Sequence, residues 1–183
     1  MIAGAVKFLV AIALPLFLLD QITKWWVHTH FALEATEEFI ERFPEALAKT
    51  AHLPRATEVI PKWFYIVYHG NTGAAFSIGR GNSTFFVTIS LLALIALLIA
   101  WRKNLFPDRL SQWGVALIIA GILGNVTDRL VHGYVIDFIQ VFLPVPWKRG
   151  NPWPTFNVAD SCIFVAAALF IFAGIRDVRK GKA

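Results

Sequence analysis

Residues 83–101 read STFFVTISLLALIALLIAW, a stretch in which no side chain carries a charge. A helix needs about 20 mostly apolar residues to cross the hydrocarbon core of a bilayer. Three further stretches are also mostly apolar, at about 3–22, 112–129 and 157–175. The sequence therefore predicts an all-α integral membrane protein with four transmembrane helices.

The composition of the whole chain supports this class. Of the 183 residues, 57% are hydrophobic and only 16% are charged, and the mean hydropathy is +0.60, whereas soluble domains are more polar. Lys7 before the first apolar run is also typical of a signal peptide, but no small-x-small cleavage site follows it. The run continues instead to Trp25 and Trp26, an aromatic pair typical of a membrane interface. We interpret it as a retained span.

Basic residues indicate the orientation of the spans. They precede the first span, occupy the link between the second and third, and close the chain: Lys7, Arg102, Lys103, Arg109, Arg176, Arg179, Lys180 and Lys182. Because cytoplasmic loops are enriched in Lys and Arg, we expect both termini to be cytoplasmic and the loops at about 27–82 and 130–156 to be external. This anchoring and attraction to anionic lipid explain the net charge of +5, so no nucleic-acid partner is expected.

The first external loop carries two local signals. Residues 63–68, WFYIVY, are rich in strand formers and are followed by Gly70, which predicts a small external β-rich region. Residues 37–49 carry apolar side chains near helical spacing, which predicts either a helix on the membrane surface or an ordinary solvated helix. We find no internal repeat and no soluble second domain, so residues 1–183 are expected to form a single membrane domain.

Five short polar segments interrupt or flank the apolar runs. They are DQITK at 20–24, NTGAAF at 71–76, GNVTDR at 124–129, GYVIDF at 133–138 and FNVAD at 156–160. Ionisable groups at such positions are costly, which makes each a functional candidate. The predicted topology puts all five segments on the same, outer side of the membrane. This arrangement indicates an active site at the boundary between water and lipid.

Local helix structure alone explains some of these residues. Lys24 follows Asp20 by four positions, which predicts an ion pair on one helix face. We favour that interpretation over a catalytic role for Asp20. Asn157 can cap the last span, with Asp160 in its first turn, where the helix dipole favours a negative charge.

Asp128 and Asp137 differ in their neighbours. Asp128 is followed at once by Arg129, which predicts a structural ion pair between the two. Asp137 has no adjacent cation and lies between Ile136 and Phe138 in a segment expected to be extended, and such apolar surroundings raise the pKa of a carboxyl. Two carboxylates that share a proton can act as acid and base and activate a water for attack on a peptide carbonyl. That chemistry needs no metal or cofactor.

Other chemistries find less support. Cys162 is the one cysteine of the chain and lies within the last span, where a packing role is expected. His28 and His30 have no third ligand nearby in sequence, so no metal site is expected. The alternative function is a small proton-coupled membrane transporter that uses intramembrane acids. It predicts a polar stripe across the bilayer, whereas residues 89–100 and 164–173 are almost purely apolar.

In this order, on four spans, the five segments resemble the lipoprotein signal peptidase family, signal peptidase II, over most of the chain. The resemblance implies an aspartic endopeptidase of the bacterial cytoplasmic membrane that removes the signal peptide of a prolipoprotein just before a cysteine carrying diacylglycerol. It implies that Asp137, in Gly-x-Val-x-Asp-Phe, and Asp160, in Phe-Asn-x-Ala-Asp, are catalytic. The implied supporting or substrate-binding residues are Asp20, Lys24, Asn71, Gly124, Asn125, Asp128, Arg129, Asn157 and Ala159.

The resemblance also sets expectations for partners. They are diacylglyceryl-modified prolipoproteins and membrane lipid, and the protein is expected to act as a monomer without cofactor or metal. The stretch at about 31–60 looks like an insertion relative to the family. The link between Asp137 and Asp160 looks long and contains Pro144, Pro146, Pro152 and Pro154. We expect these two differences to affect how substrates are admitted.

Overall fold

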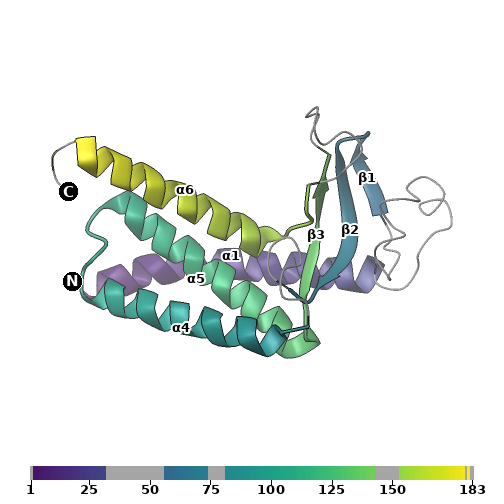
Figure 1. The fold of residues 1–183 in the computed structure, drawn as a ribbon, viewed down its shortest axis with the longest axis horizontal. Coiled ribbons are helices and arrows are strands. Elements are labelled where there is room, and N and C mark those ends of the chain that lie inside the picture. Colours follow the sequence, from purple (N-terminus) through teal and green to yellow (C-terminus); the bar gives the residue numbers. More distant parts are fainter. Residues whose placement is uncertain (1, 32–55, 74–80, 143–152, 180, 182–183) are drawn as a thin grey trace.

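Four long helices run alongside one another in the computed structural model, which describes residues 2–31, 56–73, 81–142, 153–179 and 181 (Figure 1). They are α1 (Ile2–Phe31), α4 (Ser83–Arg102), α5 (Arg109–His132) and α6 (Val158–Arg179). Helix α5 packs against each of the other three. All four are long and apolar enough to cross a membrane. Together with a small sheet at one end, they confirm the predicted fold class.

Local signals define both ends of α5. The carboxylate of Asp108 accepts hydrogen bonds from the backbone N–H groups of Leu110 and Ser111, at 3.1 and 3.2 Å. These donors have no partner within the first turn of a helix, so the cap stabilises it. Gly133 follows the last turn with a φ of 82°, a left-handed conformation that ends the helix. The turn at Gly133 leads directly into the strand that carries Asp137.

The first helix is longer than its apolar pattern predicts. The predicted span ends at about residue 22 and the predicted external loop begins at about 27, but α1 continues to Phe31. In this extension Val27 and Phe31 are buried against Ile136 and Phe138 of the sheet. Packing on the sheet therefore stabilises the last turns of α1.

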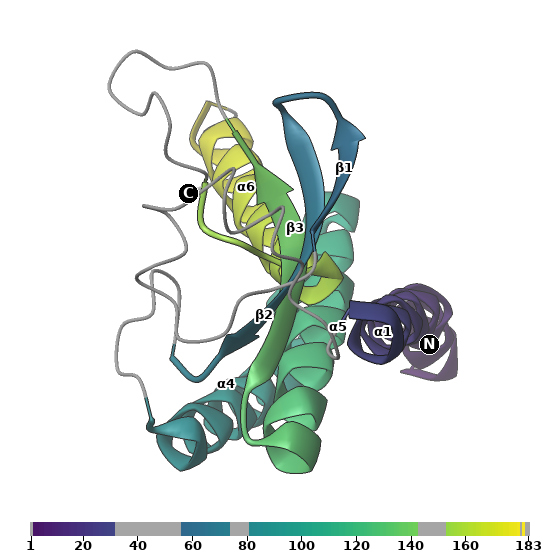
Figure 2. The same ribbon diagram turned by 90° about the vertical axis from the view of Figure 1, so that its right-hand side faces the viewer.

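A three-stranded antiparallel sheet stands at one end of the helices (Figures 1 and 2). Its strands are ordered β1 (Ala56–Ile60), β2 (Phe64–Asn71) and β3 (Val135–Val141). Strand β2 contains most of the strand predicted at 63–68, and β3 is the predicted extended segment. In the register of these two strands His69 lies opposite Asp137 and Asn71 lies opposite Val135. The sheet thus brings the second and fourth polar segments together.

The chain enters α6 along the edge of β3. The carbonyl oxygen of Phe156 accepts hydrogen bonds from the backbone N–H groups of Phe138 and Ile139, at 3.1 and 2.8 Å. This pairing brings Asn157 and the start of α6 next to β3. Some sequence-based expectations lie outside the described residues: the helix at 37–49, most of the insertion at 31–60, and Pro144, Pro146 and Pro152.

Candidate active site

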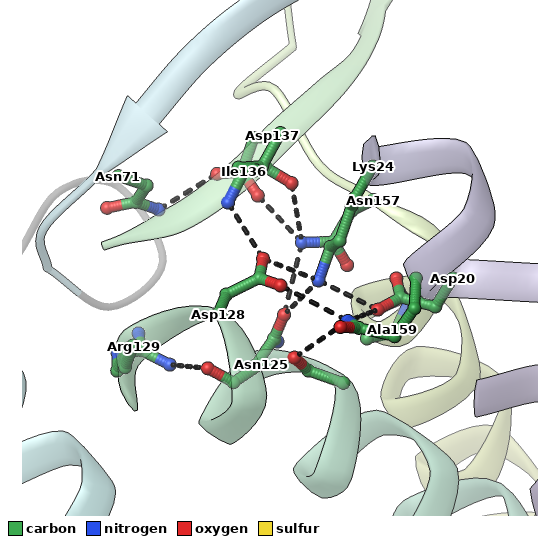
Figure 3. A network of polar contacts seen from close by, with 12 residues as sticks. Asp20, Lys24, Asn71, Asn125, Asp128, Arg129, Ile136, Asp137, Asn157 and Ala159 are labelled. Atoms are coloured by element: carbon green, nitrogen blue, oxygen red, sulfur yellow. Dashed lines mark hydrogen bonds and ion pairs between the residues drawn. The ribbon is translucent and has the colours of Figure 1, made fainter. Parts of the chain in front are cut away.

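Polar side chains from α1, α5, α6, β2 and β3 converge where the helices meet the sheet (Figure 3). The almost completely buried members of this cluster are Asp20, Lys24, Asn125, Asp128, Asp137 and Asn157. A buried polar group is costly unless a partner satisfies it, and a buried charge more so. The contacts of these side chains therefore define the site.

Lys24 holds the inner part of this network together. Its Nζ lies 2.8 Å from Oδ2 of Asp20 and 2.9 Å from Oδ2 of Asp128. It also donates a hydrogen bond to Oδ1 of Asn125 at 3.1 Å. The predicted ion pair between Asp20 and Lys24 is confirmed. Because Lys24 is 1% exposed, its single ammonium group must compensate two buried carboxylates, one from α1 and one from α5.

The predicted ion pair between Asp128 and Arg129 is wrong. Adjacent helix residues point about 100° apart, since 3.6 residues make one turn, so they do not face each other. Asp128 points toward Lys24, and its Oδ2 accepts a hydrogen bond from the backbone N–H of Ile136 at 2.9 Å. Arg129 points away from Asp128 (Figure 3). Its Nη2 donates to the carbonyl oxygen of Gly73 at 2.8 Å. Asp128 thus ties α5 to β3 one residue before the candidate catalytic aspartate.

Asn157 connects the two candidate catalytic aspartates. Its Oδ1 accepts a hydrogen bond from the backbone N–H of Asp160 at 2.8 Å, which confirms the predicted cap of α6. Its Nδ2 donates to Oδ1 of Asp137 at 2.8 Å and to Oδ1 of Asn125 at 3.1 Å. Its own backbone N–H donates to Oδ2 of Asp160 at 3.3 Å. One asparagine therefore both starts α6 and links β3 to it.

The two aspartates have different surroundings. Asp137 is 1% exposed, and its Oδ2 accepts a hydrogen bond from Nδ2 of Asn71 at 3.0 Å. Burial raises the pKa of the Asp137 carboxyl well above its usual range, and the nearby Asp160 carboxylate raises it further. Asp160 is partly exposed, and its Oδ1 accepts a hydrogen bond from Nδ2 of Asn125 at 2.8 Å. Two neighbouring carboxyl groups in such unequal environments can divide the roles of acid and base.

Comparison with known proteins shows the family of the chain. A family model described as signal peptidase (SPase) II matches residues 12–176. The chain belongs to the signal peptidase II family. The lipoprotein signal peptidase of Geobacter metallireducens is 40% identical over 135 residues, which cover 72% of this chain and 80% of that protein. That of Aeromonas hydrophila subsp. hydrophila is 42% identical over 127 residues, covering 67% of this chain and 72% of that protein.

The fold is also shared with a solved bacterial membrane enzyme, determined by the in meso method at 2.3 Å resolution. The TM-score is 0.71 at 32% sequence identity, and the match covers 93% of this chain and 88% of that one. Membership in the signal peptidase II family makes the protein a protease of lipoprotein processing. Its bacterial relatives and four apolar helices make it a multi-pass protein of the inner membrane.

The candidate site contains residues that sequence analysis left out. Gln21 donates through Nε2 to Oδ2 of Asp20 at 3.1 Å, to the carbonyl oxygen of Gly124 at 3.3 Å and to Oδ1 of Asp128 at 3.2 Å. It lies within the polar segment at 20–24, and a further polar side chain beside an ionisable one in an apolar helix is a signal that could have identified it. Gln21 therefore reinforces the contact between α1 and α5.

A second group beside the site has no comparable sequence signal. The hydroxyl groups of Tyr68 and Tyr134 lie 2.7 Å apart, and Nδ1 of His28 lies 3.0 Å from the Tyr68 hydroxyl. These residues come from β2, from the turn before β3 and from α1. Their contacts hold the sheet against the end of the first helix. Tyr134 lies in the polar segment at 133–138, whereas His28 and Tyr68 lie outside all five segments.

Gly124 allows α1, α5 and α6 to approach closely at the candidate site. A Cβ at this position would lie 2.5 Å from Oδ2 of Asp20 and 2.9 Å from Cβ of Ala159. Asp20 in turn accepts a hydrogen bond from the backbone N–H of Ala159 at 2.8 Å. Any side chain at Gly124 must therefore push Asp20 away from Lys24 or from α6.

Replacing Gly124 with Ala is expected to destabilise the protein by about 1–3 kcal/mol, as overpacking does, and to lower proteolytic activity. Thermal unfolding and cleavage rate measure the two effects. Gly174→Ala is the matched control, because nothing lies within 4 Å of a Cβ at this other helical glycine. Alanine there is expected to stabilise α6 by up to about 1 kcal/mol through helix propensity. If Gly124→Ala behaves like Gly174→Ala, the close approach at Asp20 is not required.

Proposed function

We propose that the protein is an aspartic endopeptidase that removes the signal peptide from diacylglyceryl-modified prolipoproteins and cuts just before the lipidated cysteine. Asp137 and Asp160 are its catalytic residues. The observation that carries the proposal is that Asn157 hydrogen-bonds to both aspartates, with Nδ2 on Asp137 and the backbone N–H on Asp160. Family membership supports the substrate class.

The proposed mechanism activates a water without forming a covalent intermediate. Two neighbouring carboxyl groups do not both ionise readily, so one proton is shared between them. The buried Asp137, whose pKa is raised by burial, holds this proton at rest. Asp160, partly exposed and receiving hydrogen bonds from Asn125 and Asn157, acts as the base toward water. Asp137 then protonates the carbonyl oxygen. As the tetrahedral intermediate collapses, Asp160 gives the proton it took from water to the departing amine, and the hydroxyl proton returns to Asp137.

The proposed active site lies on the outer face of the inner membrane, with both termini in the cytoplasm. Two observations support this orientation. Basic residues gather at the end of the helices away from the sheet, where the link from α4 to α5 carries Lys103 (Figure 1). Near the sheet, Trp25, Trp26 and Trp63 are 65%, 42% and 50% exposed and suit an interfacial aromatic belt.

The signal helix of the substrate is proposed to enter sideways from the lipid, while its diacylglyceryl group stays in the outer leaflet. Helix α4 supports this route, because it packs on α5 but contains no buried residue. Its apolar sides are therefore available to lipid or to another apolar helix. The peptide bond before the cysteine would then reach the depth of Asp137 and Asp160.

The transporter alternative finds no supporting observation in the described part of the chain. A transporter needs polar groups along a path through the bilayer. Helix α4 carries no charged side chain before Arg102, and α6 carries none between Asp160 and Arg176. The charged groups of these two helices lie near their ends, which suits a site at one membrane face.

Cleavage by the purified protein in lipid or detergent tests the proposal. We expect a diacylglyceryl-modified prolipoprotein to be cut so that mass spectrometry detects a mature chain beginning at the lipidated cysteine. The same prolipoprotein without diacylglycerol is the matched control and is expected to stay intact. If well-folded protein cuts neither substrate, the proposal is wrong, and measurement of solute-driven proton flux in vesicles then tests the transporter alternative.

A further inference from the structure

His69 lies beside the candidate catalytic pair, and the mechanism above does not use it. In the register of β2 and β3 it stands opposite Asp137, and residues directly opposite each other in a sheet have side chains on the same face. Its Nδ1 is 4.0 Å from Oδ2 of Asp137, the oxygen that also accepts the hydrogen bond from Asn71. His69 is therefore the second residue of β2 directed at this carboxyl oxygen.

The two side chains differ in their access to solvent. The side chain of His69 is 26% exposed, whereas that of Asp137 is 1% exposed. A partly exposed imidazole can exchange protons with water, and its unperturbed pKa of about 6.5 makes it titrate near neutral pH. The buried carboxyl thus has beside it an ionisable side chain that is partly open to solvent.

Other charged groups also act on Asp137, and among the described residues they include Lys24 from α1, Arg129 from α5 and Asp160 from α6. None of these three is a histidine, the side chain whose unperturbed pKa lies between pH 5 and 8. Asp160 is the partner that shares the proton under the proposed mechanism. His69 from β2 is therefore a group whose change of charge can alter the protonation of the pair.

We propose that His69 is a positioning residue that sets the pH range of the catalytic pair, its imidazolium charge favouring the ionised form of Asp137. This inference rests on the proposed function, because it assumes that Asp137 and Asp160 share one proton in the active form. The assigned role is electrostatic, since a separation of 4.0 Å is too long for a hydrogen bond.

The direction of the effect follows from the sign of the charge. A positive charge within about 4–6 Å stabilises a carboxylate and makes it release its proton at lower pH. With His69 charged, the form carrying one shared proton therefore persists to lower pH before a second proton binds. The same charge lets the pair lose its last proton at lower pH. Both limbs of the activity profile thus lie at lower pH with a cation at position 69 than with a neutral side chain.

The first test compares the pH profiles of kcat/KM for wild type, His69→Gln and His69→Lys with the lipid-modified prolipoprotein. We expect His69→Gln to shift the acidic limb, where the imidazole is charged, to higher pH by about one unit. His69→Lys is expected to keep the acidic limb in place and to move the basic limb to lower pH, because its charge persists there. His30→Gln, a histidine at the end of α1 stacked on Trp26, is the control and is expected to leave the profile unchanged. A purely structural role for His69 lowers the rate without moving the midpoints in opposite directions for the two variants. Coincident midpoints for wild type and His69→Gln overturn the inference.

The second test needs no cleavage and separates this inference from the proposed function. Coupling between two sites is reciprocal, so the negative charge of the pair must also stabilise the charged form of His69. In nuclear magnetic resonance of histidine-labelled protein we expect the His69 titration midpoint to fall by about one pH unit in the double variant Asp137→Asn with Asp160→Asn, which removes this charge whichever aspartate carries the proton. An unchanged midpoint shows that the two groups do not interact. If the midpoint falls but wild type never cleaves, the coupling is real and the peptidase proposal is wrong.

Discussion

Replacing Asp137 with Asn is expected to slow cleavage of the lipid-modified prolipoprotein by more than about 100-fold, and Asp160→Asn should have the same effect. General acid–base catalysis by a positioned side chain contributes about 10²- to 10⁴-fold, and an amide can neither hold nor transfer the proton. Asn at position 137 would also set its NH₂ group against one of two donors, Asn157 or Asn71, because each oxygen of Asp137 accepts one hydrogen bond. The initial rate of cleavage measures the effect.

The double variant distinguishes a catalytic pair from two independent contributions. Residues that act as a unit are strongly non-additive, so Asp137→Asn combined with Asp160→Asn should cleave no more slowly than either single variant. Asp177→Asn is the control, since it removes a carboxylate at the opposite end of α6, where Asp177 pairs with Arg176. This variant should cleave like wild type.

Asp128→Asn tests whether the catalytic pair is Asp137 and Asp160 or instead includes Asp128. Asp128 pairs with Lys24 and holds the backbone of Ile136, so its loss should lower stability while folded molecules still cleave. If folded Asp128→Asn is inactive and Asp137→Asn retains its activity, the pair has been wrongly assigned. The family membership would stand in that case.

Replacing Lys24 with Met is expected to lower the free energy of unfolding by about 3–5 kcal/mol, the usual cost of removing one partner of a buried ion pair. Without the ammonium group, Asp20 and Asp128 keep two buried carboxylates with no cation between them. The thermal unfolding temperature and the yield of folded protein in detergent measure the loss. We expect activity to fall with it, because Lys24 also orients Asn125.

Two further variants test whether the effect of Lys24→Met comes from the loss of its buried ion pairs. Lys7→Met removes an exposed ammonium group from the same helix and should leave stability within about 0.5 kcal/mol of wild type. Adding Asp20→Asn to Lys24→Met removes one of the two stranded charges, and its amide oxygen can still accept the hydrogen bond from Ala159. The double variant should therefore be more stable than Lys24→Met alone. Equal unfolding temperatures for Lys24→Met and Lys7→Met would mean that the buried network adds nothing to stability.

The observed bounds of the helices show what the hydrophobicity pattern of the sequence can predict and what it cannot. Hydrophobicity located all four helices, because crossing a bilayer requires a long apolar run whatever the neighbouring elements are. It misjudged the end of α1, because Val27 and Phe31 are buried against the sheet. Nothing near residue 27 in the sequence reveals a sheet built from residues much further along the chain.

In the candidate site, contacts between near neighbours in the chain were predictable, and contacts between distant segments were not. The ion pair between Asp20 and Lys24 and the cap formed by Asn157 were predictable, because both depend on residues within one helical turn. The partner of Asp128 was not, because it lies on another helix. Its sequence neighbour Arg129 was the wrong choice for a geometric reason, since consecutive helix residues point in different directions.

By itself, the sequence determined the four spans, the strand that carries Asp137, and the polar segments that make up the candidate site. These features depend on the transfer of apolar residues into lipid and on hydrogen bonds between near neighbours in the chain. Only the tertiary structure decided that Lys24 compensates two carboxylates, that Asn157 contacts both aspartates and that His69 stands beside Asp137. Those contacts depend on how helices are rotated about their axes and on the register of β2 with β3, and packing between distant segments sets both.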